Sequence, residues 1–445
     1  MTSPSTEQVS PQTLCKVIIA AGIGNFVEWF DFAVYGFLAT TIAQQFFPSG
    51  DASAALLKTF AVFAVAFAFR PLGGIFFGML GDRIGRKRTL AMTILLMAAA
   101  TTLIGLLPTY AAIGVTAPIL LSLIRCAQGF SAGGEYAGAC AYLMEHAPSD
   151  KRAWYGSFVP VSTFSAFAAA AVVAYALEAS LSAEAMGSWG WRLPFLIAAP
   201  LGLVGLYLRW KLDETPAFQA VKQEHAVAHS PLKETLRNHG AAICCLGAFV
   251  SLTALSFYMF TTYFATYLQV AGGLNRAMAL LVSLIALIFA AAICPLAGLY
   301  SDRVGRRVTV MTACVLLIVV VYPSFLMASS GSFAASIVGV MLLAVGAVLC
   351  GVVTAALLSE TFPTRTRYTA SAITYNMAYT IFGGTAPLVA TWLISTTGSN
   401  LSPAFYLIAV ALLALAGGLA LPETSRISLH DVGGEETSTA PLLSR

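Results

Sequence analysis

The segment Gly78–Arg88 has the sequence GMLGDRIGRKR, and residues 298–308 repeat its pattern as GLYSDRVGRRV, 220 residues later. A second echo follows each copy, because the Glu-x-x-Pro-x-x-x-Arg pattern that begins at Glu145 begins again at Glu360. Two signatures that recur in the same order at nearly the same spacing indicate an internal repeat. The chain is therefore predicted to fold as two similar halves, which would place a substrate between them near the middle of a membrane.

The composition predicts that lipid is the solvent for most of the surface. Hydrophobic residues make up 58% of the 445 residues and charged residues only 10%, whereas a soluble chain has about 25% charged residues. At roughly 20 apolar residues per crossing, the chain can form about twelve spans. The predicted fold is an all-α membrane protein, with twelve transmembrane helices in two pseudo-symmetric six-helix bundles. The net charge of +4 gives no sign of a nucleic-acid partner.

Apolar runs between charged or Pro/Gly breaks give the individual spans. They are 17–40, 54–80, 89–107, 112–144, 155–179, 192–210, 241–270, 277–299, 308–328, 333–358, 368–396 and 402–421. The corresponding domains are an N-terminal tail (1–16), an N-terminal bundle (17–211), a central loop (212–240), a C-terminal bundle (241–422) and a C-terminal tail (423–445).

The distribution of basic residues predicts the orientation. With the N-terminus inside, nineteen of the 24 Lys and Arg residues lie in cytoplasmic segments, and only Lys58, Arg192 and Arg276 lie outside. Because cytoplasmic loops carry the excess of positive charge, both termini are expected in the cytoplasm, with the chain in the cell inner membrane.

Five charged residues fall inside predicted spans of the first half: Glu28, Asp31, Arg70, Arg125 and Glu135. Such groups are costly in a bilayer and usually functional. Three acids and two arginines leave a formal charge of −1, which one bound proton would neutralise. Glu28, Asp31 and Glu135 are therefore the candidate proton-coupling residues, and Arg70 and Arg125 are candidates for holding a substrate carboxylate. The alternative is a static network of ion pairs that only fixes helix packing.

Aromatic residues on the predicted spans form a second group of candidates. They could surround an amphipathic or quaternary-ammonium substrate by cation–π attraction, or they could simply pack between helices. The candidate substrate-binding residues beside the two arginines are Trp29, Tyr35, Gln128, Tyr258, Tyr263 and Tyr375.

The loop repeat resembles the signature of the major facilitator superfamily. Four further segments resemble its metabolite:proton symporter branch, which includes carriers of proline/betaine, α-ketoglutarate, citrate and shikimate: Gly24–Phe32 (GNFVEWFDF), Arg70–Gly74 (RPLGG), Gln128–Tyr136 (QGFSAGGEY) and Trp189–Arg192 (WGWR). The resemblance implies proton-coupled symport of a small polar solute by a monomer through alternating access, with no cofactor and no metal. A zwitterion such as proline or glycine betaine is the favoured substrate, and a di- or tricarboxylate is the alternative. The tail 423–445 has no heptads, unlike the coiled coil of the osmosensory proline/betaine carrier, so osmotic activation is not expected.

The same resemblance implies that the repeated loops form ionic latches between the halves, since a purely topogenic role would need only basic residues. The candidate gate residues are Gly78, Asp82, Arg83, Gly85, Arg86 and Arg88 in the first copy, Asp302, Arg303, Gly305, Arg306 and Arg307 in the second, and Glu145, Arg152, Glu360 and Arg367 in the second echo.

Other functions fit the sequence less well. Gly129–Gly133 matches the G-x-S-x-G pattern of hydrolases, but it lies inside a predicted span and not after a strand, so no enzyme is expected. A channel would show flux that does not saturate, and a sensor would need an output domain larger than the central loop or the tail.

Overall fold

The computed structural model describes residues 11–49, 51–84, 86–210, 231–362 and 367–425, and the regular elements in these ranges are all helices. In the first half they are α1 (Pro11–Phe37), α2 (Ala39–Phe46), α3 (Ala52–Ala68), α4 (Arg70–Ile84), α5 (Arg86–Leu106), α6 (Tyr110–Ile113), α7 (Thr116–Ala132), α8 (Glu135–His146), α9 (Arg152–Gly156), α10 (Phe158–Ser180), α11 (Ala183–Ser188), the 3₁₀ turn η1 (Gly190–Arg192), α12 (Leu193–Leu196) and α13 (Ala198–Trp210).

The second half consists of longer helices. They are α15 (Pro231–Tyr258), the π-helical turn η2 (Met259–Tyr263), α16 (Phe264–Val270), α17 (Arg276–Val304), α18 (Arg306–Ala328), α19 (Phe333–Glu360), α20 (Arg367–Ala378), the π-helical turn η3 (Tyr379–Gly383), α21 (Ala386–Thr397) and α22 (Ser402–Leu419).

These helices form the predicted spans. In the described part of the chain, nine helices are long and apolar enough to cross a membrane, and the bent pair of α1 and α2 makes a tenth. The two other predicted spans are the shorter apolar stretch Ala91–Leu106 and the broken pair of α7 and α8. The seventh span begins at His239, close to the predicted residue 241. Helix α15 itself begins earlier, at Pro231, and has a kink at His239.

Several spans are interrupted near mid-length, which apolar periodicity does not predict. The first span bends by 64° between α1 and α2, and the fourth is broken at Gly133 and Gly134. The seventh and eleventh spans contain the π-helical turns η2 and η3, and such turns often occur at functional sites. Backbone irregularity at this depth is tolerated where it is buried in protein or lines a cavity.

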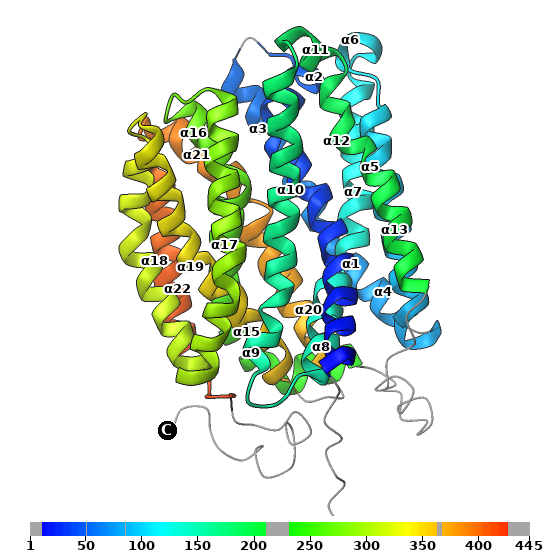
Figure 1. Cartoon of the computed structure of the whole chain (residues 1–445), viewed down its shortest axis with the longest axis vertical. Coiled ribbons are helices and arrows are strands. Elements are labelled where there is room, and N and C mark those ends of the chain that lie inside the picture. The colour runs from blue at the N-terminus through cyan, green and yellow to red at the C-terminus, as the bar shows by residue number, and fades with distance from the viewer. Residues whose placement is uncertain (1–10, 50, 85, 211–230, 363–366, 426–445) are drawn as a thin grey trace, which may run out of the picture.

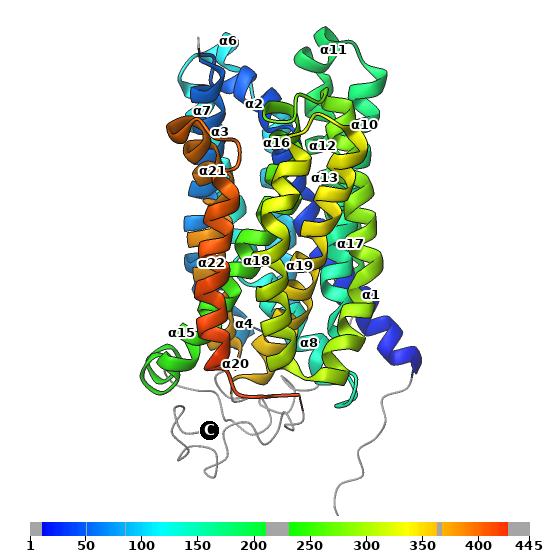
Figure 2. The same cartoon turned by 90° about the vertical axis from the view of Figure 1, so that its left-hand side faces the viewer.

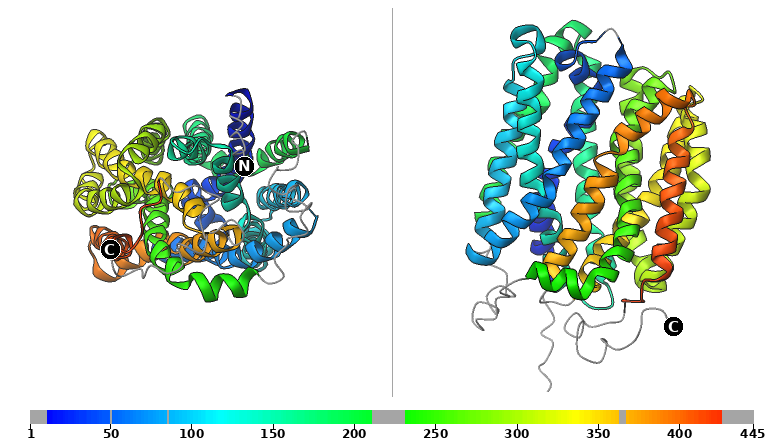
Figure 3. Two further views of the ribbon diagram at one scale, coloured as in Figure 1. Left: turned by 90° about the horizontal axis from the view of Figure 1, so that it is seen from below. Right: turned by 180° about the vertical axis from the view of Figure 1, so that it is seen from behind.

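Most helices run along the long axis, and they form two groups that lie side by side across it, α1–α13 and α15–α22 (Figure 1). Contacts between α10 and α17, α8 and α19, α4 and α20, and α3 and α21 join the groups. Small residues allow the close approach: a Cβ at Gly298 would lie 2.6 Å from the carbonyl oxygen of Ala153 in the other group. The start of α1 and the end of α22 lie at the same end of the molecule (Figures 2 and 3), which we call the terminal end, and the other is the far end.

Candidate functional site

An aromatic cluster joins the two groups of helices around Trp29 of α1, whose side chain is 1% exposed. The ring centroid of Trp29 lies 5.0 Å from that of Phe257, 6.2 Å from that of Tyr258 and 6.4 Å from that of Tyr379. Tyr258 and Tyr379 border or begin the two π-helical turns, so the irregular backbone of the second half supplies this wall.

The cluster continues from Tyr379 to the first half through stacked tyrosines. The ring of Tyr375 lies 3.9 Å from that of Tyr379 and 4.4 Å from that of Tyr136 on α8, nearly parallel to the latter. We call Trp29, Tyr136, Phe257, Tyr258, Tyr375 and Tyr379 the central aromatic cluster.

Asn25 fixes the orientation of the Trp29 indole. Its Oδ1 accepts a 2.9 Å hydrogen bond from Trp29 Nε1, one turn along α1. Its Nδ2 donates to α10, at 2.8 Å to Ser162 Oγ and 2.7 Å to Thr163 Oγ1. A buried amide with this many partners has few alternative arrangements, so Trp29 is held rigidly against α10.

Arg70 lies beside the cluster as the first residue of α4, with a fully buried side chain. Its Nη2 donates to Glu28 Oε1 at 3.2 Å, and its guanidinium carbon lies 5.7 Å from the Trp29 ring centroid and 5.3 Å from that of Phe67. Within the described part of the chain, Arg70 Nε and Nη1 have no hydrogen-bond partner. Burying donors without partners is costly, and these two atoms have unused capacity to donate hydrogen bonds.

A second polar network lies inside the first group of helices. Arg125 Nη1 donates to Gln128 Oε1 at 2.8 Å, Gln128 Nε2 donates to Thr101 Oγ1, and Thr101 Oγ1 donates to Asp31 Oδ2 at 2.9 Å. The guanidinium of Arg125 stacks on Tyr35, at 4.2 Å from the ring centroid. All of these side chains are buried. Asp31 and Arg125 are thus linked indirectly, through a chain of two neutral side chains.

Glu135 completes the acidic set at the start of α8. It accepts a 3.3 Å hydrogen bond from Thr93 of α5, and it lines a small cavity together with Glu28 and Ser131. The cavity volume of about 10 Å³ is close to the minimum for one water molecule.

The structure therefore places most of the predicted site residues in two groups and leaves one residue, Tyr263, apart from both. Trp29, Tyr258 and Tyr375 lie with Arg70 and Glu28, whereas Tyr35 and Gln128 lie with Arg125 and Asp31. Tyr263 lies apart from Trp29, with its ring 6.3 Å from Phe60 and 6.1 Å from Tyr267. Tyr263 is the last residue of the π-helical turn η2.

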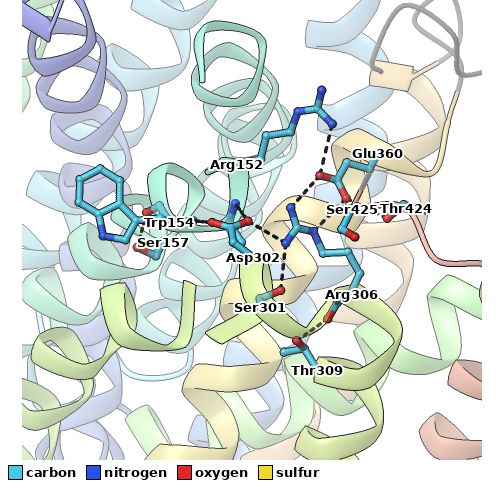
Figure 4. Close-up of polar contacts among 12 residues, drawn as sticks. Arg152, Trp154, Ser157, Ser301, Asp302, Arg306, Thr309, Glu360, Thr424 and Ser425 are labelled. Carbon is cyan, nitrogen blue, oxygen red and sulfur yellow. Dashed lines mark hydrogen bonds and ion pairs between the residues drawn. The ribbon is translucent and has the colours of Figure 1, made fainter. Parts of the chain in front are cut away.

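At the terminal end, charged residues of the two helix groups meet (Figure 4). Arg306 binds Glu360 through two hydrogen bonds of 3.0 Å and Asp302 through one of 2.9 Å. Asp302 also accepts hydrogen bonds from the backbone N–H groups of Ala153 and Trp154 at the start of α9, and Arg152 lies 3.8 Å from Glu360. The predicted gate residues Arg152, Asp302, Arg306 and Glu360 thus connect the two groups, and we call them the terminal-end cluster.

The other predicted gate residues are placed as follows. Gly305 has a φ of +95°, which favours glycine, Arg307 donates to the carbonyl oxygen of Leu419, and Arg88 and Arg303 are exposed. Gly85 and the side chains of Asp82, Arg83, Arg86, Glu145 and Arg367 lie outside the described residues, as does the environment of Gly78.

Glu423, just after α22, supports the terminal-end cluster. Its carboxylate accepts hydrogen bonds from the backbone N–H groups of Arg306 and Arg307, at the start of α18, and Thr424 donates to Glu360 at 2.8 Å. Partial burial favours the neutral carboxyl, but the hydrogen bonds from Arg306, Ser425 and Arg307 outweigh it and lower the pKa of Glu423 below its usual value.

At the far end, Arg276 of the second group contacts the first group. Its Nη1 lies 3.3 Å from Glu178 at the end of α10. Its Nη2 donates to Thr41 at 2.6 Å and also to Thr40, both on α2. We call Arg276, Glu178, Thr40 and Thr41 the far-end cluster. Polar contacts therefore join the same two groups of helices at both ends of the molecule.

Comparison with known proteins identifies the family. The family model described as Major Facilitator Superfamily matches residues 21–385 and 295–444. The chain belongs to the major facilitator superfamily. It is 39% identical to the proline/betaine transporter of Salmonella typhimurium over 422 residues, which cover 93% of this chain and 84% of that protein. It is 35% identical to the ectoine/proline transporter ProP of Corynebacterium glutamicum over 440 residues, covering 96% and 87%.

Solved structures agree with this assignment at the level of the fold. The proton:xylose symporter XylE, bound to 6-bromo-6-deoxy-D-glucose, superposes with a TM-score of 0.75 at 17% identity, covering 95% of this chain and 98% of that one. This superfamily member is thus a multi-pass membrane transporter of a small molecule and not an enzyme. The predicted fold class and the predicted family are confirmed.

Several residues of this transporter that shape the site were missed by sequence reasoning. Asn25 could have been found as a polar residue one turn before Trp29 inside an apolar span. The hydroxyls of Thr93 and Thr101 carry no such signal, because threonine is common in helices and usually bonds its own backbone. The sequence indicates Arg276 only as one of three basic residues outside, and it gives no signal for Glu178.

Proposed function

We propose that the protein is a proton-coupled symporter of a small zwitterion, such as proline or glycine betaine, and that it works by alternating access. The observation that carries this proposal is that aromatic rings suited to a cation and arginine donors suited to an anion lie together at the boundary between the halves. The electron-rich faces of Trp29, Phe257 and Tyr379 suit a quaternary or secondary ammonium group, and the free donors of buried Arg70 suit a carboxylate. The names of the relatives, which include proline, betaine and ectoine carriers, support the same substrate class.

The proton would be carried by the buried acids Glu28, Asp31 and Glu135, which are at most 4% exposed. Each is a carboxylate held away from water, and each touches a hydroxyl or an arginine through which its charge can be compensated. With the two arginines, this set has a formal net charge of −1, so one proton per cycle would neutralise it.

The terminal-end cluster and the far-end cluster would act as latches that form and break in alternation during this cycle. The halves 17–211 and 241–422 would rock about the central aromatic cluster, with the far-end cluster broken when the site opens outward and the terminal-end cluster broken when it opens inward. The terminal end would face the cytoplasm, in the inner membrane, with both chain termini there, and one monomer would suffice.

Ligand screening followed by transport tests this proposal. Purified protein is heated with proline, glycine betaine, ectoine, α-ketoglutarate, citrate or shikimate at pH 6 and pH 8, since a ligand raises the apparent stability by mass action. We expect stabilisation by the zwitterions, and uptake of the same compounds into proteoliposomes with acidification of the lumen. Stabilisation and uptake only with α-ketoglutarate or citrate would contradict the zwitterion and support the carboxylate alternative.

A further inference from the structure

We propose that Asn376 determines specificity for the ammonium group of the substrate, by accepting a hydrogen bond from an N–H that proline has and quaternary betaines lack. The inference rests on the proposed function and adds to it a residue that separates two kinds of zwitterion. It assigns the buried side-chain oxygen of Asn376, on α20 of the second half, as the acceptor.

The side chain of Asn376 is held in one orientation. It is 2% exposed, and its Nδ2 donates a 2.7 Å hydrogen bond to the carbonyl oxygen of Gly133, at the break between α7 and α8. Because a carbonyl oxygen can only accept, this bond fixes which end of the amide is the nitrogen. Oδ1 is therefore the end turned away from this carbonyl group, and it is buried without a hydrogen-bond partner among the described residues.

Asn376 lies beside Arg70. Nη2 of Arg70 is 3.4 Å from the carbonyl oxygen of Ala132, which precedes Gly133 in the chain, so the guanidinium and the amide bind neighbouring carbonyl groups. The packing of α20 against α4 is close because Gly74, one turn after Arg70, has no side chain: a Cβ there would lie 3.2 Å from Asn376 Nδ2. A substrate carboxylate on Arg70 would bring the ammonium close to Asn376, because a single carbon separates the two groups in proline and in glycine betaine.

The unused hydrogen-bonding atoms of this region include both donors and an acceptor. Nε and Nη1 of Arg70 and the hydroxyl of Tyr258 are buried without a partner in the described part of the chain. Asn376 Oδ1 can accept a hydrogen bond and cannot donate one. Since unpaired buried groups are costly, the set is satisfied best by a ligand that brings both a carboxylate and an N–H. Proline has both, whereas glycine betaine has only the carboxylate.

The aromatic rings around Trp29 do not distinguish the two kinds of ammonium group in this way. Their faces attract a cation whether or not its nitrogen carries a hydrogen, and the indole N–H of Trp29 is a donor that already binds Asn25. Glu28 is a second buried acceptor, but its Oε1 already binds Arg70. The aromatic cluster therefore holds the positive charge, and Asn376 adds the preference for an N–H.

The experiment uses three ligands that differ only at the nitrogen: proline, N-methylproline and N,N-dimethylproline. All three have the carboxylate and the ring, and the first two keep an N–H, whereas the third has none. Dissociation constants are measured with purified protein by titration calorimetry. We expect wild-type protein to bind the first two with similar affinity and the third roughly tenfold more weakly, since a hydrogen bond from a charged group is lost. Equal affinities for N-methylproline and N,N-dimethylproline would overturn the proposal.

Variants of Asn376 separate the loss of the acceptor from the loss of packing. Asn376→Leu has a similar volume and no acceptor, so the tenfold difference between N-methylproline and N,N-dimethylproline should disappear. Asn376→Asp keeps an oxygen at this place and should keep the difference. A tenfold difference that persists in Asn376→Leu would show that Asn376 only packs the halves together.

Thr380→Val is the matched control for the contact between the halves. Thr380 lies one turn after Asn376, and its hydroxyl donates a 2.8 Å hydrogen bond to the carbonyl oxygen of Phe67 in the first half. Its loss should weaken binding of all three ligands by the same factor. A change in the ratio of the three affinities as large as that in Asn376→Leu would contradict a specific role of Asn376.

The outcome separates this inference from the proposed function. If none of the three ligands binds and α-ketoglutarate or citrate does, both are contradicted. If glycine betaine binds and the three prolines do not, a zwitterion remains the substrate and the role of Asn376 is contradicted. The comparison of the three ligands needs only the wild-type protein, so a variant that fails to fold does not prevent the decision.

Discussion

Asp31 lies at the end of a hydrogen-bonded chain that runs from Arg125 through Gln128 and Thr101. Its Oδ1 is buried without a partner among the described residues, so the ionised form is only partly compensated. Asp31 differs in this respect from Glu28, which contacts Arg70 directly.

We predict that Asp31→Asn keeps exchange of labelled for unlabelled substrate but loses accumulation against a gradient. The amide can still accept the hydrogen bond from Thr101, so the fold is kept, but it cannot carry a proton. Both fluxes are measured in the same proteoliposomes. Thr101→Val is the matched comparison, because it leaves the carboxylate in place and removes its hydroxyl partner. Full accumulation by Asp31→Asn would exclude this acid from coupling.

Asn25 offers a second prediction at this scale. Asn25→Ala leaves the Trp29 indole N–H without its acceptor and frees three acceptors of α10, at a cost of about 1–3 kcal/mol. We expect a lower thermal midpoint and weaker substrate binding, together with a changed emission spectrum of Trp29 in a protein whose other tryptophans are replaced. Ser162→Ala removes only one of these contacts and should have a much smaller effect. An unchanged Trp29 spectrum in Asn25→Ala would contradict the positioning role.

The charged residues of the site were predictable because a charge in an apolar span is rare, whereas their partners were not. Sequence reasoning grouped Glu28, Asp31, Arg70 and Arg125 as one cluster, but the structure pairs the first with the third and links the other two separately. That pairing depends on how α1, α4, α5 and α7 rotate about their axes, and the residue spacing within one helix does not fix this rotation between helices.

At the scale of elements, close packing of α3 and α4 against α7 holds Arg70 in place. A Cβ at Gly129 would lie 1.7 Å from the carbonyl oxygen of Ala66, and one at Gly73 would lie 1.7 Å from that of Phe130. The backbones are in contact there, as small residues at helix crossings allow. Gly129 of the fourth span therefore packs directly against the backbone of α3.

We predict that Gly129→Ala is destabilised by at least about 3 kcal/mol, because a backbone oxygen cannot move aside as a side chain can. Its folded yield after detergent extraction, measured by gel filtration, should fall severely. Gly351→Ala is the matched control on α19, where a Cβ would meet nothing within 4 Å. Equal yields for the two variants would contradict this packing.

The sequence predicted the spans but not the breaks within them. Apolar runs gave the number and order of the spans, but the break at Gly133 and Gly134 and the π-helical turns lie inside runs that look continuous. At the break, Asn376 of α20 donates a hydrogen bond to the carbonyl oxygen of Gly133, across the two halves. Hydrogen bonds between distant helices leave no periodic signal.

At the scale of the whole molecule, the duplication was predictable from the two sequence echoes and the span count from the apolar runs. The echoes also contain Arg152, Asp302, Arg306 and Glu360, but they did not reveal the contacts Arg152–Glu360 and Arg306–Asp302. The far-end cluster was not predictable, because Arg276, Glu178 and Thr40 belong to no repeat. A sequence repeat identifies residues that both halves share. Residues that occur in one half only, such as Arg276, give no such signal.

We predict that the two clusters have opposite effects on the position of the halves. Glu360→Gln should open the terminal end, and Arg276→Gln should open the far end, each by shifting a population between two states. Spin labels in a cysteine-free background report both ends, at positions 150 and 422 for the terminal end and 184 and 399 for the far end. Asp51→Asn is a control at an exposed carboxylate. Both substitutions shifting the same pair of labels would contradict the latch roles.

Transport against a gradient tests proton coupling most directly. Proteoliposomes with an alkaline interior are given labelled glycine betaine, with and without a protonophore, in buffers containing either sodium or potassium. The account predicts accumulation that requires the proton gradient, collapses with the protonophore and is the same in both salts. Accumulation that survives the protonophore and requires sodium would contradict it.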